Sequence, residues 1–323
     1  MSQFGDQNTK ERENIVGLSM KGGKRDQFFF CLLEFFPDEK RWFLKSLLQV
    51  KDEEGLSGDE AIRSWIDKYE VKQLVLDIPL SDAACANCLL DCPGSNQCPE
   101  PGVVEVRRRM DEILEKDKEY EKKNPKKYEQ DRNRDDLYDY GRNTLHEPAD
   151  SYIMSRSFKR RLKKGFIPYW NRSIDFFVWS NYYNQLLQFF NLSFDSFGIT
   201  STMVQSRFNY LQRHFPRGMS LSESRGPLVL IELLRSGIIL QRDLDNMKDL
   251  DLGIEARLDI IKRVEKGLGL FIYDNDLELL VKNPRAFDSF LLAIAGQNNL
   301  MSKSHRLPDW SYPEETKFII PKF

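Results

Sequence analysis

The chain has 323 residues, enough to bury a substantial core in one large domain with insertions or in two smaller domains. Apolar residues make up 41% of the sequence and charged residues 30%, and the formal net charge of −2 excludes a global attraction to nucleic acid or to anionic membranes. No run approaches the roughly 18 apolar residues of a transmembrane helix, and the polar N-terminus lacks the apolar segment of a secretion signal. We therefore expect a cytoplasmic protein without a membrane partner.

The first quarter of the chain predicts three strands, a helix and a fourth strand. Apolar runs of strand length occupy residues 14–19, 27–36 and 42–50, after a polar segment, 1–13, that we expect to be a disordered tail. Ser57 and Glu60 have the spacing of a capping box, which predicts a helix that begins there. Residues 72–78 (KQLVLDI) then form a buried strand. This order predicts a mixed α/β sheet.

The middle of the chain predicts an insertion over residues 82–165. Residues 82–102 are rich in Cys, Pro and Gly and are expected to form an irregular loop. Residues 103–165 are expected to form a charged helical arm, with a helix that is interrupted at Pro125. A solvated arm without chemistry is the simpler reading of such mixed charge.

The remaining residues predict further helices and two short strands. Asn283 and Pro284 suit the cap and the first turn of a late helix. Helices are expected over residues 176–190, 200–215, 227–236, 254–266, 276–281 and 283–298, and strands over 217–224 and 317–321.

Several short segments, read in order, resemble a known family. They are IVGLSMKGG (15–23), LVLDIPLS (74–81), YWNRSID (169–175), LSESRGPLVLIELLRSGI (221–238) and NPRAFDSFLLAIAG (283–296). The order is similar to that of the ribonuclease-H-like family of predicted nucleases known as domain of unknown function 429. The resemblance implies one domain over residues 14–323, with three antiparallel strands followed by parallel strands, flanked by helices.

The resemblance also implies an acidic site. Its fourth-strand acid would be Asp77 and its late-helix acid Asp288, with Glu223 as a third, and such acids hold Mg²⁺ or Mn²⁺ against a phosphodiester. Asp77 ends an apolar strand at the edge where open α/β sheets bind ligands. The alternatives are a cap or an ion pair for Asp77, stabilisation of the helix N-terminus for Asp288, and an ordinary strand-end residue for Glu223.

Ser19 stands where the family pattern has the first-strand aspartate. A neutral hydroxyl is a poor ligand for Mg²⁺ and removes a negative charge from a site that would have to hold two cations. We therefore expect weakened hydrolysis, one-metal chemistry, or a site kept only for binding.

Four of the five cysteines predict a metal site. Cys85, Cys88, Cys92 and Cys98 follow the pattern C-x2-C-x3-C-x5-C within one loop. Clustered thiols in a cytoplasmic protein favour metal over disulfide, and four sulfurs suit a structural zinc ion. An iron–sulfur cluster and unmetallated thiols are the alternatives.

A basic run is the candidate contact for nucleic-acid phosphates. SRSFKRRLKKGF contains no acidic residue, and aromatic residues follow it at 169 and 170. The alternative is a solvated helix face that pairs with the acidic arm. The candidate residues are Arg156, Lys159, Arg160, Arg161, Lys163 and Lys164, with Arg172 nearby.

Two functions follow from these patterns. The first is a metal-dependent nuclease that acts on nucleic-acid phosphodiesters, with activity weakened by Ser19. The second is a catalytically inactive ribonuclease-H-like protein that binds a nucleic acid or a protein partner and carries a structural metal.

Overall fold

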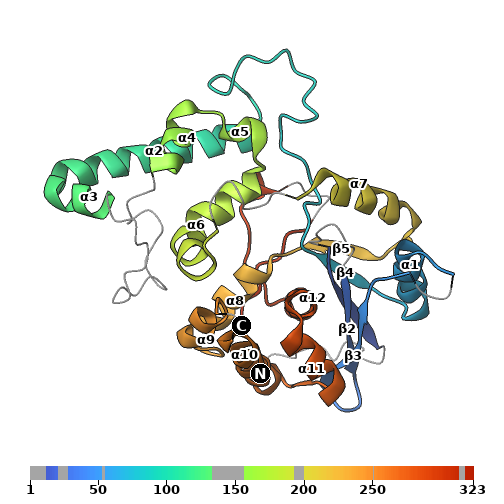
Figure 1. Cartoon of the computed structure of the whole chain (residues 1–323). Helices are drawn as coiled ribbons and strands as arrows, with labels where there is room; N and C mark the ends of the chain where they lie inside the picture. Colours follow the sequence, from blue (N-terminus) through green and yellow to red (C-terminus); the bar gives the residue numbers. More distant parts are fainter. Residues whose placement is uncertain are drawn as a thin grey trace, which may run out of the picture. The chain divides into compact units, whose positions relative to one another are not determined.

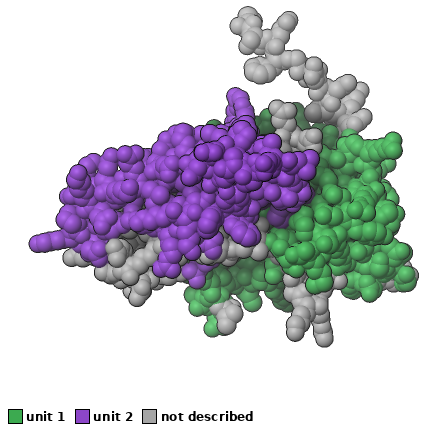
Figure 2. All heavy atoms as spheres, turned by 90° about the horizontal axis from the view of Figure 1, so that it is seen from above, with its two compact units in different colours: residues 1–78, 200–305, 318–323 green, residues 79–199, 306–317 purple. Residues whose placement is uncertain are grey.

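The structure is a computed structural model that describes residues 12–20, 28–52, 55–132, 156–192, 200–249, 251–312 and 317–323. The chain forms two compact units, coloured separately in Figure 2. Unit 1 comprises residues 1–78, 200–305 and 318–323, and unit 2 comprises residues 79–199 and 306–317. Most of the predicted tail, residues 1–11, lies outside the described residues.

A six-stranded mixed sheet forms the centre of unit 1 (Figure 1). Its strands lie in the order β5-β4-β1-β2-β3-β6. Strands β1, β2 and β3 pair antiparallel, whereas β4 runs parallel to β1, β5 to β4, and β6 to β3. The predicted α/β class, with antiparallel strands followed by parallel ones, is confirmed at this level. The strands are β1 (Glu13–Ser19), β2 (Phe29–Phe36), β3 (Arg41–Gln49), β4 (Gln73–Leu76), β5 (Ser220–Glu223) and β6 (Leu270–Phe271).

Helix α12 (Pro284–Leu300) packs against one face of this sheet because two glycines let the backbones approach. A Cβ atom on Gly17 of β1 would clash with the backbone of Ser289 and Ala293. A Cβ atom on Gly296 would lie 2.9 Å from the side chain of Val75 in β4. The helix therefore lies directly on β1 and β4, and it contributes much of the buried apolar core.

Helix α1 (Gly58–Lys68) covers part of the opposite face. Phe30 and Gly17 lie on different faces because side chains alternate along paired strands. The ring of Trp65 in α1 meets that of Phe30 in an edge contact, with centroids 5.5 Å apart. The predicted capping box forms, since Glu60 N donates to Ser57 Oγ and Ser57 N donates to the Glu60 carboxylate. This fixes the start of the helix.

The other helices of unit 1 follow the predicted segments, with one addition. They are α7 (Thr202–Leu211), α8 (Gly226–Arg235), α9 (Gln241–Asn246), α10 (Leu252–Leu268) and α11 (Asp274–Lys282). Helix α9 and strand β6 were not predicted, and the strand expected over 317–321 forms only isolated bridges, at Phe318 and at Pro321.

Unit 2 begins with an irregular segment, residues 79–100, and the regular elements of its described part are helices. The charged segment forms two helices that break at Asn124, before Pro125, as the sequence predicts. Helices α4 and α6 pack against α2, and the ring of Phe158 in α4 contacts those of Trp179 and Tyr183 in α6. The helices are α2 (Pro101–Lys123), α3 (Pro125–Arg132), α4 (Arg156–Lys164), α5 (Ile167–Trp170) and α6 (Ser173–Phe190).

Across both units, none of the helices that the structure describes is long and apolar enough to cross a bilayer.

Candidate functional site

Three of the four predicted site residues meet at one edge of the sheet in unit 1. Ser19 ends β1, Asp77 follows β4, and Glu223 ends β5. These three strands are parallel neighbours, so their carboxyl ends lie side by side.

Asp77 is almost fully buried, and both of its carboxylate oxygens accept hydrogen bonds from the chain. Only 2% of the surface of Asp77 is exposed to solvent. Ser19 Oγ donates to Oδ2 at 2.8 Å, and the backbone N–H of Met20 donates to Oδ1 at 2.9 Å. The carboxylate therefore ties the end of β1 to the end of β4, which is a structural task.

Glu223 is fully buried, and its partner is Arg225. The guanidinium of Arg225 donates to Glu223 Oε1 at 2.6 Å and also to the backbone oxygen of Asp77. Both side chains of the pair are shielded, with 0% exposure for Glu223 and 4% for Arg225. Removing either partner would leave a buried charge uncompensated, so this pair stabilises the turn between β5 and α8. No sequence pattern singled out Arg225.

Asp288 lies on the second turn of α12, at the end of that helix nearest the same edge. A Cβ atom on Gly226, the first residue of α8, would lie 3.4 Å from Asp288 Oδ1. The side chain is 36% exposed, and Arg285 Nη1 lies 3.8 Å from Oδ2. Among the four predicted side chains, only Asp288 has substantial access to solvent.

These partners do not fit a two-metal centre. Bridging cations need several ionised oxygens that are free to bind them. Here the oxygens of Asp77 are engaged by Ser19 and Met20, and Glu223 is neutralised by Arg225. Among the residues that the structure describes, no group of three or more His, Cys, Asp or Glu side chains is arranged to hold a metal ion.

The four clustered cysteines lie in the loop of unit 2 that precedes α2. All four thiols are free, and Cys88 and Cys92 are exposed. Burial raises the pKa of Cys85, and the neighbouring thiols Cys98, Cys88 and Cys92 raise that pKa further. The four sulfurs are therefore close enough to interact electrostatically, although they do not converge on one point.

Ser95, inside this loop, anchors it to the α4–α5 region. The backbone N–H of Ser95 donates to Tyr169 Oη at 2.7 Å, and Ser95 Oγ donates to the backbone oxygen of Gly165 at 3.3 Å. Arg107 of α2 donates to the backbone oxygen of Ser95 at 3.1 Å. The cysteine loop and the basic run thus share one part of unit 2.

The basic run divides into internal and exposed residues. Lys159 pairs with Asp117 and donates to Tyr128 Oη, and the buried guanidinium of Arg172 pairs with Asp175 at 2.7 Å. The side chain of Arg156 lies outside the described residues. Four cations remain at the surface: Arg160, Arg161, Lys163 and Lys164.

Two exposed aromatic side chains follow these cations directly. Phe166 is 55% exposed and Trp170, in α5, is 79% exposed. Exposed apolar side chains that lie together and are bordered by polar residues are typical of interaction sites. The exposed cations of α4 together with Phe166 and Trp170 are called the basic–aromatic surface below.

No family model, curated protein or solved structure matches this chain. The ribonuclease-H-like resemblance and the functions that it implies therefore stay predictions.

Proposed function

We propose that this protein binds nucleic acid through the basic–aromatic surface of unit 2, and that its ribonuclease-H-like core in unit 1 does not hydrolyse the bound strand. The observation that carries the proposal is the run of four exposed cations followed within six residues of Lys164 by two exposed aromatic side chains. Cations bind the phosphate backbone, and aromatic rings stack on bases that are not paired. The combination favours single-stranded nucleic acid.

The strand order supports a ribonuclease-H-like core. An antiparallel β1–β2–β3 arrangement, extended by parallel β4 and β5 on the β1 side, agrees with the fold that the sequence resemblance implies. The hydrogen bonds of Asp77 and the ion pair of Glu223 with Arg225 support the absence of hydrolysis, because both carboxylates already stabilise the fold.

A structural zinc ion held by Cys85, Cys88, Cys92 and Cys98 belongs to the same proposal. The donor set suits zinc, and the loop is already held by Ser95 beside α4 and α5. Zinc would fix the loop in place beside the basic–aromatic surface, which is a positioning role.

Fluorescence anisotropy with labelled 20-nucleotide single-stranded RNA and DNA tests the binding half. We expect Lys163→Gln/Lys164→Gln to weaken binding and to reduce the slope of log K against log salt by about 1.4, since each phosphate contact to a single strand contributes about 0.7. Trp170→Ala should weaken binding roughly tenfold through lost stacking.

The matched control is Lys122→Gln/Lys123→Gln on α2 of the same unit. Both lysines are exposed, so the control removes the same charge from a different surface. Binding that is equal in the control and in the Lys163/Lys164 variant would remove the basic–aromatic surface as the site. Absence of binding at low salt in the wild type would remove the function altogether.

Incubation of the same oligonucleotides with Mn²⁺ or Mg²⁺ tests the non-hydrolytic half. We expect no cleavage by the wild-type protein. Metal-dependent cleavage that is lost in Asp77→Asn would contradict the proposal and would restore the nuclease hypothesis.

A further inference from the structure

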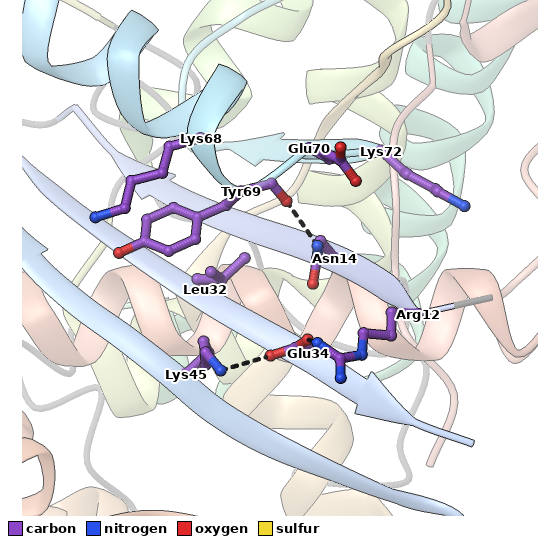
Figure 3. Close-up of a pocket in the computed structure, with 9 residues that line it drawn as sticks. All are labelled: Arg12, Asn14, Leu32, Glu34, Lys45, Lys68, Tyr69, Glu70 and Lys72. Atoms are coloured by element: carbon purple, nitrogen blue, oxygen red, sulfur yellow. Dashed lines mark hydrogen bonds and ion pairs between the residues drawn. The ribbon is translucent and has the colours of Figure 1, made fainter. Parts of the chain in front are cut away.

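A hollow of about 540 Å³ opens on the α1 side of the sheet in unit 1, beyond the end of that helix (Figure 3). Its volume is in the range of small-molecule sites. Eight of the nine lining residues have polar or charged side chains. They come from three strands, the end of α1 and the neighbouring loops: Arg12, Asn14, Leu32, Glu34, Lys45, Lys68, Tyr69, Glu70 and Lys72.

The hollow exists because α1 is shorter than the strands that it covers. Trp65 and Tyr69 cover Phe30, whereas Asn14 and Glu34, which pair across β1 and β2, lie past the helix end. Asn14 Nδ2 donates to the backbone oxygen of Tyr69 at 2.6 Å and so satisfies a carbonyl of the last turn. The side chain of Asn14 thereby joins the helix end to the sheet.

A β-bulge brings a cation into the same hollow. Leu32 faces Ser46 across β2 and β3, but Leu33 faces Leu44, so Lys45 is the extra residue. Such a bulge turns its side chain away from the regular alternation. The ammonium of Lys45 lies 3.2 Å from Glu34 Oε2. Without the bulge, the regular alternation of side chains would place Lys45 on the opposite face of the sheet.

The floor of the hollow presents two buried acceptor oxygens, and one of them lacks a donor. Asn14 Oδ1 accepts no hydrogen bond from the described groups, whereas Glu34 Oε2 lies 3.2 Å from the ammonium of Lys45. Glu34 itself is 5% exposed, and its charge is balanced by Lys45 and by Arg12, whose side chain is 66% exposed. A ligand hydroxyl group that reaches Asn14 Oδ1 supplies the missing donor once the exposed Arg12 side chain moves aside.

The rim of the hollow is positively charged. Four of the lining residues are cationic and two are acidic, so the lining keeps a net positive charge. Lys72 also has an acidic neighbour outside the lining, since its Nζ lies 3.9 Å from Glu13 Oε1. Figure 3 shows Lys68 and Lys72 reaching out on opposite sides of Tyr69, above the floor formed by Leu32, Asn14 and Glu34. This arrangement favours a ligand whose anionic group stays at the rim.

We propose that this hollow binds a small sugar phosphate, with its hydroxyl groups on the floor and its phosphate at the lysine rim. The proposal goes beyond nucleic-acid binding and concerns unit 1 alone. Acceptors on the floor and cations at the rim match a molecule that has donors at one end and negative charge at the other. Leu32 provides an apolar surface for the ring carbons.

Isothermal titration calorimetry of the full chain with ribose 5-phosphate, ribose and inorganic phosphate tests the site. We expect ribose 5-phosphate to bind at least roughly tenfold more tightly than either fragment, because only it uses both the floor and the rim. The double variant Lys68→Gln/Lys72→Gln should weaken ribose 5-phosphate roughly tenfold, while both lysines are exposed enough for the fold to persist.

The control is Lys262→Gln, which removes an exposed charge from α10 of the same unit. Equal affinities of the control and the Lys68/Lys72 variant would overturn the site. Absence of ribose 5-phosphate binding at millimolar concentration would also overturn the site. If inorganic phosphate bound as tightly as ribose 5-phosphate, the floor of the hollow would not be part of the binding site. A nucleic-acid titration of the Lys68/Lys72 variant separates this result from the function of unit 2, since its binding should match that of the wild type.

Discussion

Glu70 occupies a backbone conformation that suits glycine. Its φ angle is +46°, directly after the end of α1. The N–H of Val71 donates to the backbone oxygen of Ile66 at 3.1 Å, so the helix ends in a left-handed turn of the type that glycine usually closes. A non-glycine residue in this region is disfavoured by roughly 1 kcal/mol.

Glu70→Gly should therefore increase the free energy of unfolding by about 1 kcal/mol. Chemical denaturation followed by circular dichroism measures this change. Glu255→Gly is the matched control, since it places the same substitution at an exposed position inside α10 and should cost about 1 kcal/mol. A loss of stability in both variants would mean that the left-handed backbone at Glu70 carries no strain.

The sequence predicted which residues would gather at the carboxyl edge of the sheet, but it did not predict their hydrogen-bond and ion-pair partners. Strand order alone brings Ser19, Asp77 and Glu223 together, because parallel neighbours end at one edge. Strand order could not show that the guanidinium of Arg225 would pair with the carboxylate of Glu223, since that contact depends on the turn between β5 and α8. Ser19, which departs from the pattern of the family that the sequence resembles, donates a hydrogen bond to Asp77.

At the scale of elements, a buried network joins α2, α3 and α4. Lys159 of α4 pairs with Asp117 of α2 and donates to Tyr128 Oη of α3, while Tyr128 also donates to Asp117. Asp117 has a side-chain exposure of only 5%. The sequence of the basic run suggests a surface patch, but one of its lysines, Lys159, joins helices in the interior of unit 2.

Lys159→Met should destabilise unit 2 by roughly 3 kcal/mol, because it leaves the carboxylate of Asp117 buried with only a tyrosine hydroxyl. Denaturant unfolding monitored by tryptophan fluorescence measures this change. Lys163→Met on the same helix removes an exposed charge and should cost less than about 0.5 kcal/mol. Equal costs would show that the network does not stabilise the helices.

The same network predicts an alkaline dependence. Burial lowers the pKa of Lys159, but the hydrogen bonds to Asp117 and Tyr128 outweigh it, so that the pKa is raised above 10.5. A raised pKa stabilises the fold below the unfolded value, and this contribution is lost as the pH rises through the folded value. The difference in stability between wild type and Lys159→Met should therefore shrink above about pH 10.5.

Elements with strong local signals were predicted, and elements fixed by tertiary contacts were not. The Ser57 capping box and the Asn283 cap each form, with Asn283 Oδ1 accepting from the N–H of Arg285 at 2.9 Å. Strand β6 has two residues, too few for any periodicity, and exists because it pairs with β3. The bulge at Lys45 could not be predicted either, because it is defined by the pairing of β3 with β2.

At the scale of the molecule, the proposed zinc ion should affect the two units unequally. All four cysteine ligands belong to unit 2, so chelation with EDTA should lower the melting temperature of that unit and leave that of unit 1 unchanged.

Differential scanning calorimetry with and without EDTA measures the melting of the two units, and elemental analysis measures the zinc content. We expect about one zinc per chain and an EDTA-sensitive transition that disappears in Cys85→Ser/Cys98→Ser. Cys31→Ser is the control, since this buried thiol of β2 lies in unit 1. A metal-free protein that melts identically in EDTA would exclude the zinc site.

The order in which unit 1 is assembled from the chain has a consequence for its synthesis. The N–H of Ile319 donates to the backbone oxygen of Glu223 at 2.7 Å, and the side chains of Ile319 and Ile320 are buried. A ribosome releases these residues only after all of unit 2 has been made, so the outer edge of β5 stays unpaired until then. Such an open edge is a template for aggregation, and the nascent chain should therefore depend on chaperones until residues 318–320 emerge.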